Sequence, residues 1–177
     1  DAAGLAVATK FDAQISRNNA ASNNVSSALS YSQTQDGFLG KVSKALDRMS
    51  ELMNLANDAT KSTNDKANYN TEFTDLKNYI SDLGTKEFNG VSLFDGSGLA
   101  VTKDSEGNTW TLNASDLNDT DITSVIASGF TVTSTMSTLT TSIENVSTHR
   151  AQVGGNIQRL NLTNEQLGIL SENLQAS

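Results

Sequence analysis

The chain has 177 residues, a formal net charge of −8 and no cysteine, and charged residues make up 18% of it. This length suffices for one domain with a buried core, while the absence of cysteine excludes disulfides, thiolate metal sites and cysteine nucleophiles. A negative chain without a Lys/Arg cluster is a poor partner for nucleic acid. No apolar run approaches the ~20 residues of a membrane-spanning helix, so we expect no membrane partner.

The first 57 residues contain no Pro and only three Gly, and their apolar residues recur at helical spacing. A stripe with alternating steps of three and four runs through Leu39, Val42, Leu46, Met49, Met53 and Ala56. It predicts one long helix over 1–57, with 36–40 as the place for any bend. Such a helix would measure roughly 80 Å, about twice the width of a compact chain, so we expect an elongated molecule. The stripe is weaker upstream, where Asn18 and Ser22 occupy seam positions.

Residues 58–66 are polar and predict a loop, because their side chains compete with the backbone for hydrogen bonds. A second helix is predicted over 66–83, antiparallel to the first, with Gly84 as its stop. Its apolar residues, Phe73, Leu76, Ile80 and Leu83, are spaced three, four and three apart.

The middle of the chain predicts turns and short strands. In FNGVSLFDGSG, Asn89 and Gly90 suit positive φ, and the alternating runs LAVTKD and NTWTLN flank a turn at 105–107, which predicts a hairpin partly covered by Trp110. Residues 114–129 mix signals and support no firm assignment.

A final helix is predicted over 135–177, with a stripe that runs through Leu139, Ile143, Val146, Arg150, Val153, Ile157 and Leu160. The adjacent Gly154 and Gly155 cost it up to ~2 kcal/mol relative to Ala, which suggests close helix contact or a need for flexibility. The predicted fold is mainly α: an elongated helical bundle of two long terminal helices plus one shorter antiparallel helix, with a small β-hairpin region in the middle. We divide it into an N-terminal helical part (1–95), a short acidic β/turn-rich insertion (96–133) and a C-terminal helix (134–177).

Four ordered segments resemble bacterial flagellins: DAAGLAVATKF at 1–11, LDRMSELMNLA at 46–56, EFNGVSLFDG at 87–96 and HRAQVGGNIQRL at 149–160. Flagellins typically carry a DDAAG segment, an LQR(V/M)(R/S)EL segment, an FNG turn and an LG(A/G)xQNR segment in this order. The resemblance covers about three quarters of the chain. It implies the inner helical domain of a compact flagellin, without large outer domains and trimmed at both ends.

The resemblance implies a structural subunit of the extracellular flagellar filament, which polymerises with other flagellin subunits and meets an export chaperone and the filament cap. Residues 1–177 alone are expected to be monomeric. Arg48, Leu52 and Glu72 align with flagellin positions seen by a vertebrate Toll-like receptor, although Asp47 and Ser50 replace the usual Gln and Arg. The alternative for Arg48 is a plain ion pair with Asp47 or Glu51.

Most stripe residues are expected to form the core, whereas a smaller set is expected to contact other subunits. These assembly candidates are Phe11, Ile15, Val25, Leu29, Leu160, Leu167 and Leu174. We expect no catalytic residue, metal or cofactor: His149 is the only His, and neither a phosphate-binding Gly loop nor a zinc-protease motif occurs. Two other functions stay open, a junction protein between hook and filament and a flagellin-like adhesin or glycan-binding protein that uses Trp110.

Overall fold

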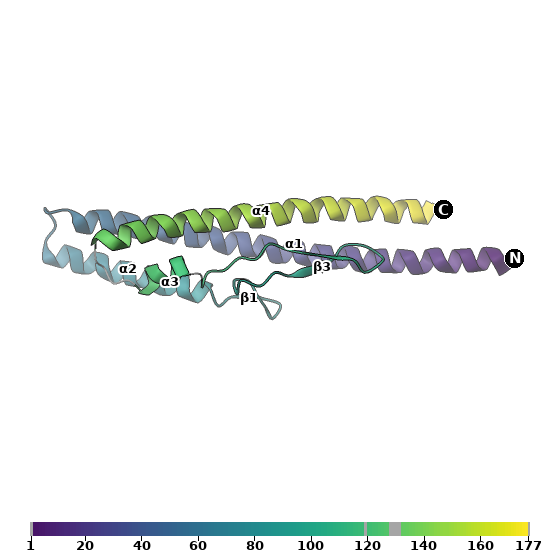
Figure 1. Ribbon diagram of the computed structural model, residues 1–177, viewed down its shortest axis with the longest axis horizontal. Helices are drawn as coiled ribbons and strands as arrows, with labels where there is room; N and C mark the ends of the chain where they lie inside the picture. The colour runs from purple at the N-terminus through teal and green to yellow at the C-terminus, as the bar shows by residue number, and fades with distance from the viewer. Residues whose placement is uncertain (1, 119, 128–131, 177) are drawn as a thin grey trace. The chain divides into compact units, whose positions relative to one another are not determined.

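A computed structural model describes residues 2–118, 120–127 and 132–176. Two long helices, α1 (Ala2–Asn57) and α4 (Val132–Ala176), and two shorter ones, α2 (Thr63–Leu83) and α3 (Thr120–Ala127), account for most of these residues. The strands form two antiparallel pairs, β1 (Glu87–Phe88) with β2 (Val91–Ser92) and β3 (Ala100–Thr102) with β4 (Thr109–Thr111) (Figure 1). The predicted mainly α fold is therefore confirmed, and α1 is helical without interruption through 36–40. No described helix is both long and apolar enough to cross a membrane.

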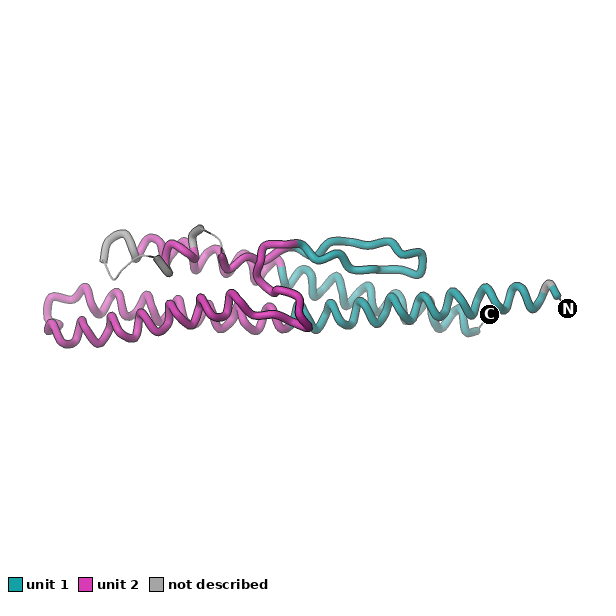
Figure 2. Tube along the Cα trace, turned by 90° about the horizontal axis from the view of Figure 1, so that it is seen from below, with its two compact units in different colours: residues 1–33, 98–113, 153–177 teal, residues 34–97, 114–152 magenta. Residues whose placement is uncertain are grey.

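The chain divides into two compact units, coloured separately in Figure 2. Unit 1 comprises residues 1–33, 98–113 and 153–177, so it holds the β3–β4 hairpin together with the N-terminal part of α1 and the C-terminal part of α4. Unit 2 comprises residues 34–97 and 114–152, and it holds α2, α3 and the β1–β2 hairpin. The three-part division expected from the sequence stays a prediction.

The core of unit 2 is the strong stripe of α1, in which Leu39, Val42, Leu46, Met49, Met53 and Ala56 are all buried. Facing apolar residues are Phe73, Ile80 and Leu83 of α2 and Leu139 and Val146 of α4. Burying a side chain of this size stabilises the fold by about 1.5–3 kcal/mol. The stripe therefore acts as the main source of hydrophobic stabilisation in this unit.

The helix α2 begins three residues earlier than predicted, because Ser62 caps it. The Ser62 hydroxyl accepts a hydrogen bond from the Asp65 amide at 3.2 Å, and the Asp65 carboxylate accepts one from the Ser62 amide at 3.0 Å. This reciprocal arrangement is a capping box, which satisfies N–H groups that have no partner inside the helix. The prediction of a loop through residue 66 is thus wrong at its end, whereas the predicted stop at Gly84 is confirmed.

The predicted turns of the middle segment are present. Asn89 and Gly90 have φ of 51° and 75°, and they connect β1 to β2. Gly107, with φ of 86°, lies in the loop that connects β3 to β4. Such values favour Gly and Asn over other residues. Sequence reasoning left 114–129 unassigned, and helix α3 lies within this range.

In unit 1, α1 and α4 lie side by side and antiparallel (Figure 1). The Asn18 amide donates to the carbonyl of Leu167 at 2.8 Å, and the Ser22 hydroxyl donates to Asn164 at 2.9 Å. The β3–β4 hairpin is held to both helices, since Arg17 of α1 donates to the carbonyl of Ser105 at 3.1 Å. Asn156 of α4 exchanges two hydrogen bonds with the backbone of residue 113.

Gly154 and Gly155 do not lie in a tight helix contact within the described chain. A Cβ placed on either glycine would have no neighbour within 4 Å. The close-packing explanation is therefore wrong inside this chain. Both glycines destabilise the helix relative to Ala, and no contact in the described chain offsets this loss.

Candidate assembly and recognition surfaces

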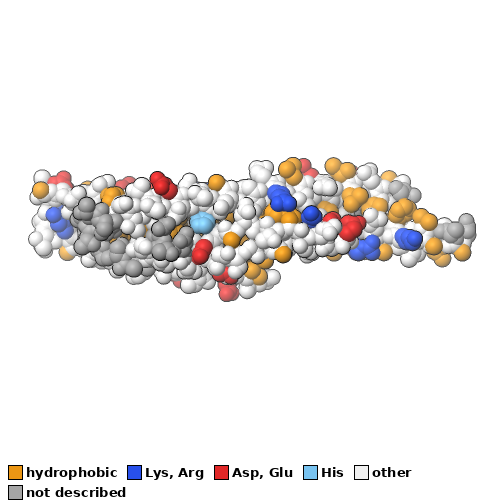
Figure 3. All heavy atoms as spheres, viewed as in Figure 1, with side chains coloured by type: hydrophobic (Ala, Val, Ile, Leu, Met, Phe, Trp, Pro, Cys, Tyr) orange, Lys and Arg blue, Asp and Glu red, His pale blue; other side chains and the backbone are white. Residues whose placement is uncertain are grey.

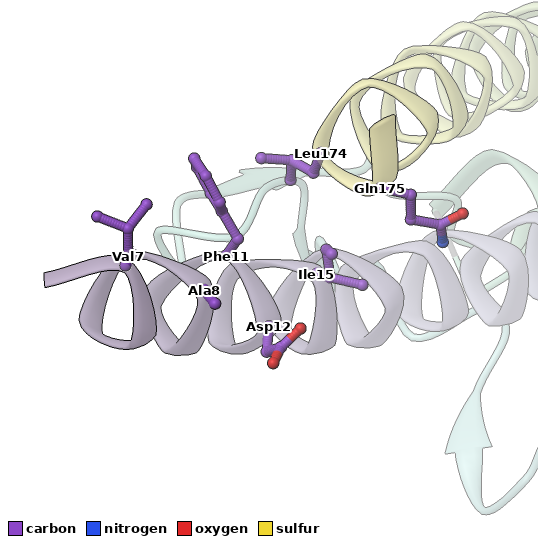
Figure 4. Close-up of a pocket in the computed structure, with 8 residues that line it drawn as sticks. Val7, Ala8, Phe11, Asp12, Ile15, Leu174 and Gln175 are labelled. Atoms are coloured by element: carbon purple, nitrogen blue, oxygen red, sulfur yellow. The ribbon is translucent and has the colours of Figure 1, made fainter. Parts of the chain in front are cut away.

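An open groove in unit 1 is lined by residues near the N-terminal end of α1 and the C-terminal end of α4. Its lining includes Val7, Phe11, Ile15 and Leu174, with Asp12 and Gln175 at its polar edge. In Figure 4, Phe11 of α1 and Leu174 of α4 point toward one another across the groove, while Asp12 points away. The side chains of Phe11, Ile15 and Leu174 are half-buried. The groove thus brings together three of the seven assembly candidates.

The other four candidates lie deeper in the unit. Val25 and Leu160 are fully buried, Leu167 is 3% exposed, and Leu29 is half-buried. Their apolar surface is largely covered by the unit itself. A role for them in contacts between subunits stays a prediction, and the groove residues are better placed for such a role.

A second apolar surface was missed by sequence reasoning and lies on the outer side of α4. Leu162 and Ile169 are 64% and 62% exposed, and they are seven residues apart. Each follows a buried residue of the Leu160 and Leu167 stripe by two positions, which places it about 200° around the helix at about 100° per residue. Figure 3 shows hydrophobic side chains at the surface over the ends of α1 and α4, where Leu5 and Val7 are also exposed. The seven-residue spacing of Leu162 and Ile169 was visible in the sequence, but it does not show which side of the helix faces water.

The receptor candidates lie in unit 2, where Arg48 of α1 bridges two carboxylates. Its Nε donates to Oε1 of Glu72 at 2.6 Å, and its Nη1 donates to Oε2 of Glu51 at 2.9 Å. These hydrogen bonds, first with Glu72 and then with Glu51, raise the pKa of Arg48, and the bond from Arg48 lowers the pKa of Glu72. Arg48 and Glu72 form an exposed pair on neighbouring helices, whereas the third candidate, Leu52, is fully buried.

Neither unit offers residues suited to hold a metal within the described ranges. No three His, Cys, Asp or Glu side chains among the described residues lie close enough to share an ion. His149 is half-buried on α4, and its Nδ1 has no hydrogen-bond partner among the described residues.

The family described as the bacterial flagellin N-terminal helical region matches residues 1–99. The chain belongs to the bacterial flagellin family. Flagellins are structural subunits that assemble with one another into the flagellar filament outside the cell.

Individual flagellins extend the likeness beyond the N-terminal region. The flagellin of Halalkalibacterium halodurans is 32% identical over 186 residues, which cover 100% of this chain and 68% of that protein. The flagellin of Clostridium tyrobutyricum is 37% identical over 145 residues, which cover 76% of this chain but 38% of the relative. The match to the first relative places the C-terminal helix in the family as well.

Solved structures show the same helical fold. The crystal structure of Bacillus cereus flagellin matches with a TM-score of 0.73 at 27% identity and covers 82% of this chain and 88% of that one. A putative flagellar hook-associated protein from Vibrio parahaemolyticus matches with a TM-score of 0.86 over 99% of this chain and 96% of its own. At 15% identity the second likeness concerns the fold alone.

Proposed function

We propose that this flagellin joins neighbouring subunits of the filament through the apolar surfaces of unit 1. The observation that carries the proposal is the exposed pair Leu162 and Ile169 on the outer side of α4. Together with the groove at Phe11 and Leu174, this pair leaves apolar area in water on two sides of one helix. Apolar surface of this kind is stabilised when a partner covers it, and the family supplies that partner as another subunit.

The test is to replace Leu162 and Ile169 together by Gln in a cell whose only flagellin is this protein. We expect few or short filaments by electron microscopy and a loss of swimming, with the thermal unfolding midpoint unchanged because both side chains are exposed. The matched control replaces Leu55 and Val91 by Gln, which are also exposed but belong to unit 2. Normal filaments in the Leu162 and Ile169 variant would contradict the proposal.

The other partners expected from the resemblance are an export chaperone and the filament cap. Pull-down of each from cell extract, with the chain bearing a C-terminal tag, tests these two contacts separately. Residues 1–177 alone should sediment as a monomer, and filaments at micromolar concentration would contradict this expectation. The role is structural, so no turnover of a substrate is expected.

A junction protein between hook and filament is the second candidate, because a putative hook-associated protein shares the fold. The two roles differ in where the protein lies along the flagellum. Immunogold labelling along the whole filament supports the filament subunit, whereas labelling restricted to its base supports the junction role.

A glycan-binding role has weak support from the aromatic residues. Trp110 is 8% exposed, and the guanidinium carbon of Arg159 lies 3.9 Å from the centre of its ring. The ring face that would stack on a sugar is therefore occupied. A glycan array without binders is the expected result.

Recognition by a vertebrate Toll-like receptor is supported by the exposed Arg48 and Glu72 pair. Arg at an interface with a desolvated contact is often a binding hot spot. Replacing both residues by Ala removes the pair and leaves Glu51 as an exposed carboxylate without its Arg48 partner. We expect at least a tenfold weaker response in receptor reporter cells. The control replaces another exposed pair of unit 2, Asp82 and Lys86, by Ala. An equal response from both variants would contradict receptor recognition at Arg48.

A further inference from the structure

A polar pocket lies in unit 1 between the β3–β4 hairpin and α4, apart from the apolar surfaces described above. Its lining consists of Lys103, Asp104, Trp110, Arg159, Thr163 and Gln166. Two of the six are cations in a chain whose net charge is −8. Neither Lys103 nor Arg159 forms an ion pair within the described part of the chain, and this sets them apart from Arg48, Lys86 and Arg150, which all do.

The one carboxylate of the pocket, that of Asp104, is already engaged. The Asp104 carboxylate accepts from the backbone amide of Glu106 at 3.1 Å and from the amide and side chain of Asn108 at 2.9 and 2.8 Å. These bonds, with the Asn108 side chain first, lower the pKa of Asp104. The Thr163 hydroxyl donates to the carbonyl of Arg159 at 2.8 Å. The Thr163 and Gln166 oxygens can still accept, whereas the two cations of the pocket, Lys103 and Arg159, offer donors only.

The donors that a ligand can reach are the Lys103 ammonium, the Arg159 guanidinium and the Gln166 amide, and the Trp110 ring lies beside them. The indole nitrogen is buried and has no hydrogen-bond partner among the described residues. The contact of the Arg159 guanidinium with the Trp110 ring, at 3.9 Å from the ring centre, holds the guanidinium in place and so reduces the entropy lost when a ligand binds. A ligand that supplies only acceptors matches this set.

We propose that this pocket binds a carboxylate, held by the guanidinium of Arg159 and the ammonium of Lys103. A carboxylate offers two coplanar oxygens that suit the guanidinium fork. The pocket holds two cations and one carboxylate, Asp104, so the negative charge of the ligand balances the remaining positive charge. The carboxylate can come from a small free acid or from an acidic side chain of another protein, and both present the same group.

Trp110 is the only tryptophan of the chain, so its fluorescence reports on this pocket without interference. The probes are glutarate, as a free dicarboxylate, and the capped peptide Glu-Glu-Glu, as an acidic segment of protein. Both are added to the whole chain at constant ionic strength. Glutaramide and capped Gln-Gln-Gln are their neutral controls. We expect a saturable change in fluorescence with an acidic probe and none with its neutral control.

The variant Lys103→Gln should weaken that binding at least tenfold, because it removes one of the two charges. Arg159→Lys should also weaken it, since it keeps the charge but loses the fork. The matched control is Lys86→Gln in unit 2, which should bind as the parent does. Circular dichroism of each variant checks that the fold is intact.

The outcomes separate the sources of the carboxylate. Saturation by glutarate assigns the site to small free acids, and saturation by the peptide alone assigns it to an acidic protein segment. No saturable response to either acid would overturn the proposal. An equal response to the neutral probes, or parent-like binding by Lys103→Gln, would overturn it as well. The fluorescence measurements do not depend on filament formation, so their outcome is independent of the assembly proposal.

Discussion

The side-chain amide of Asn18 donates a hydrogen bond to the backbone carbonyl of Leu167, and this bond lies in the buried seam between α1 and α4 of unit 1. Asn18 is 1% exposed, and its Oδ1 has no partner in the described part of the chain. An unpaired buried acceptor is unfavourable, but a single buried Asn can fix the register of two packed helices. The seam therefore has a defined register and less stability than a fully apolar one.

Replacing Asn18 by Leu should make the chain more stable. The change removes the unpaired oxygen and adds buried apolar surface, so we expect the free energy of unfolding to rise by about 1–2 kcal/mol. This corresponds to a melting temperature higher by roughly 4 °C, measured by circular dichroism. The control is Asn19→Leu at the exposed neighbouring position, which should leave the melting temperature nearly unchanged. A lower melting temperature for Asn18→Leu would show that the hydrogen bond outweighs the apolar gain.

The capping box at Ser62 leads to a second prediction. Ser62→Ala should lower the free energy of unfolding by about 1 kcal/mol at neutral pH, because it removes the hydroxyl that caps α2. Urea unfolding measures the loss, and Ser81→Ala, an exposed site inside α2, should show none.

The effect of Ser62→Ala should depend on pH. Hydrogen bonds from Ser62 lower the pKa of Asp65 below its ordinary value of 3.8. A carboxyl group with a lowered pKa in the folded state stabilises the fold above its ordinary pKa, and this contribution disappears as the pH falls through the folded value. The difference between Ser62→Ala and the parent should therefore shrink as the pH falls below 3.8. A difference that stays constant with pH would contradict the role of the Asp65 carboxylate.

Gly154 and Gly155 of α4 lead to a prediction in which the stability of the isolated chain and its ability to form filaments change in opposite directions. Gly154→Ala and Gly155→Ala each place a Cβ in open space, so each should raise the free energy of unfolding by about 0.5–1 kcal/mol. Gly98→Ala is the contrasting variant, because its Cβ would lie 2.5 Å from Cγ2 of Thr111 and should destabilise the hairpin. If another subunit approaches α4 at these glycines, the stabilised variants will form filaments poorly. Destabilisation of the isolated chain by Gly154→Ala would contradict the open surroundings.

The sequence predicted best those features that depend on local chemistry. The turn at Asn89 and Gly90 follows from their tolerance of positive φ, and the buried stripe from Leu39 to Ala56 follows from helical spacing. The predicted start of α2 was wrong because Ser62 was assigned to the loop. Ser62 and Asp65 occupy the first and fourth positions of a capping box, and this pattern marks the start of the helix.

Features that depend on tertiary packing were harder to predict. α3 has the sequence TDITSVIA, in which five of the eight residues are β-branched, so its helix propensity is modest. Its buried residues Ile122 and Val125 stabilise it by packing within unit 2. The exposed Leu162 and Ile169 follow the same seven-residue spacing as the buried stripe, so periodicity alone does not show which stripe faces water. The burial of Leu52 beside the exposed Arg48 likewise required the structure.

Leu52 gives the sharpest test of which receptor candidates are surface residues. Its side chain is fully buried, so Leu52→Ala should lower the free energy of unfolding by about 2–5 kcal/mol through lost contacts and a residual cavity. Leu55→Ala is the matched control on the same helix, since Leu55 is 36% exposed and should lose far less. Urea unfolding of both variants measures the difference, and reporter cells measure recognition by the receptor. A Leu52→Ala variant that keeps the stability of the parent but loses the receptor response would contradict a core role and would place this side chain in the receptor contact.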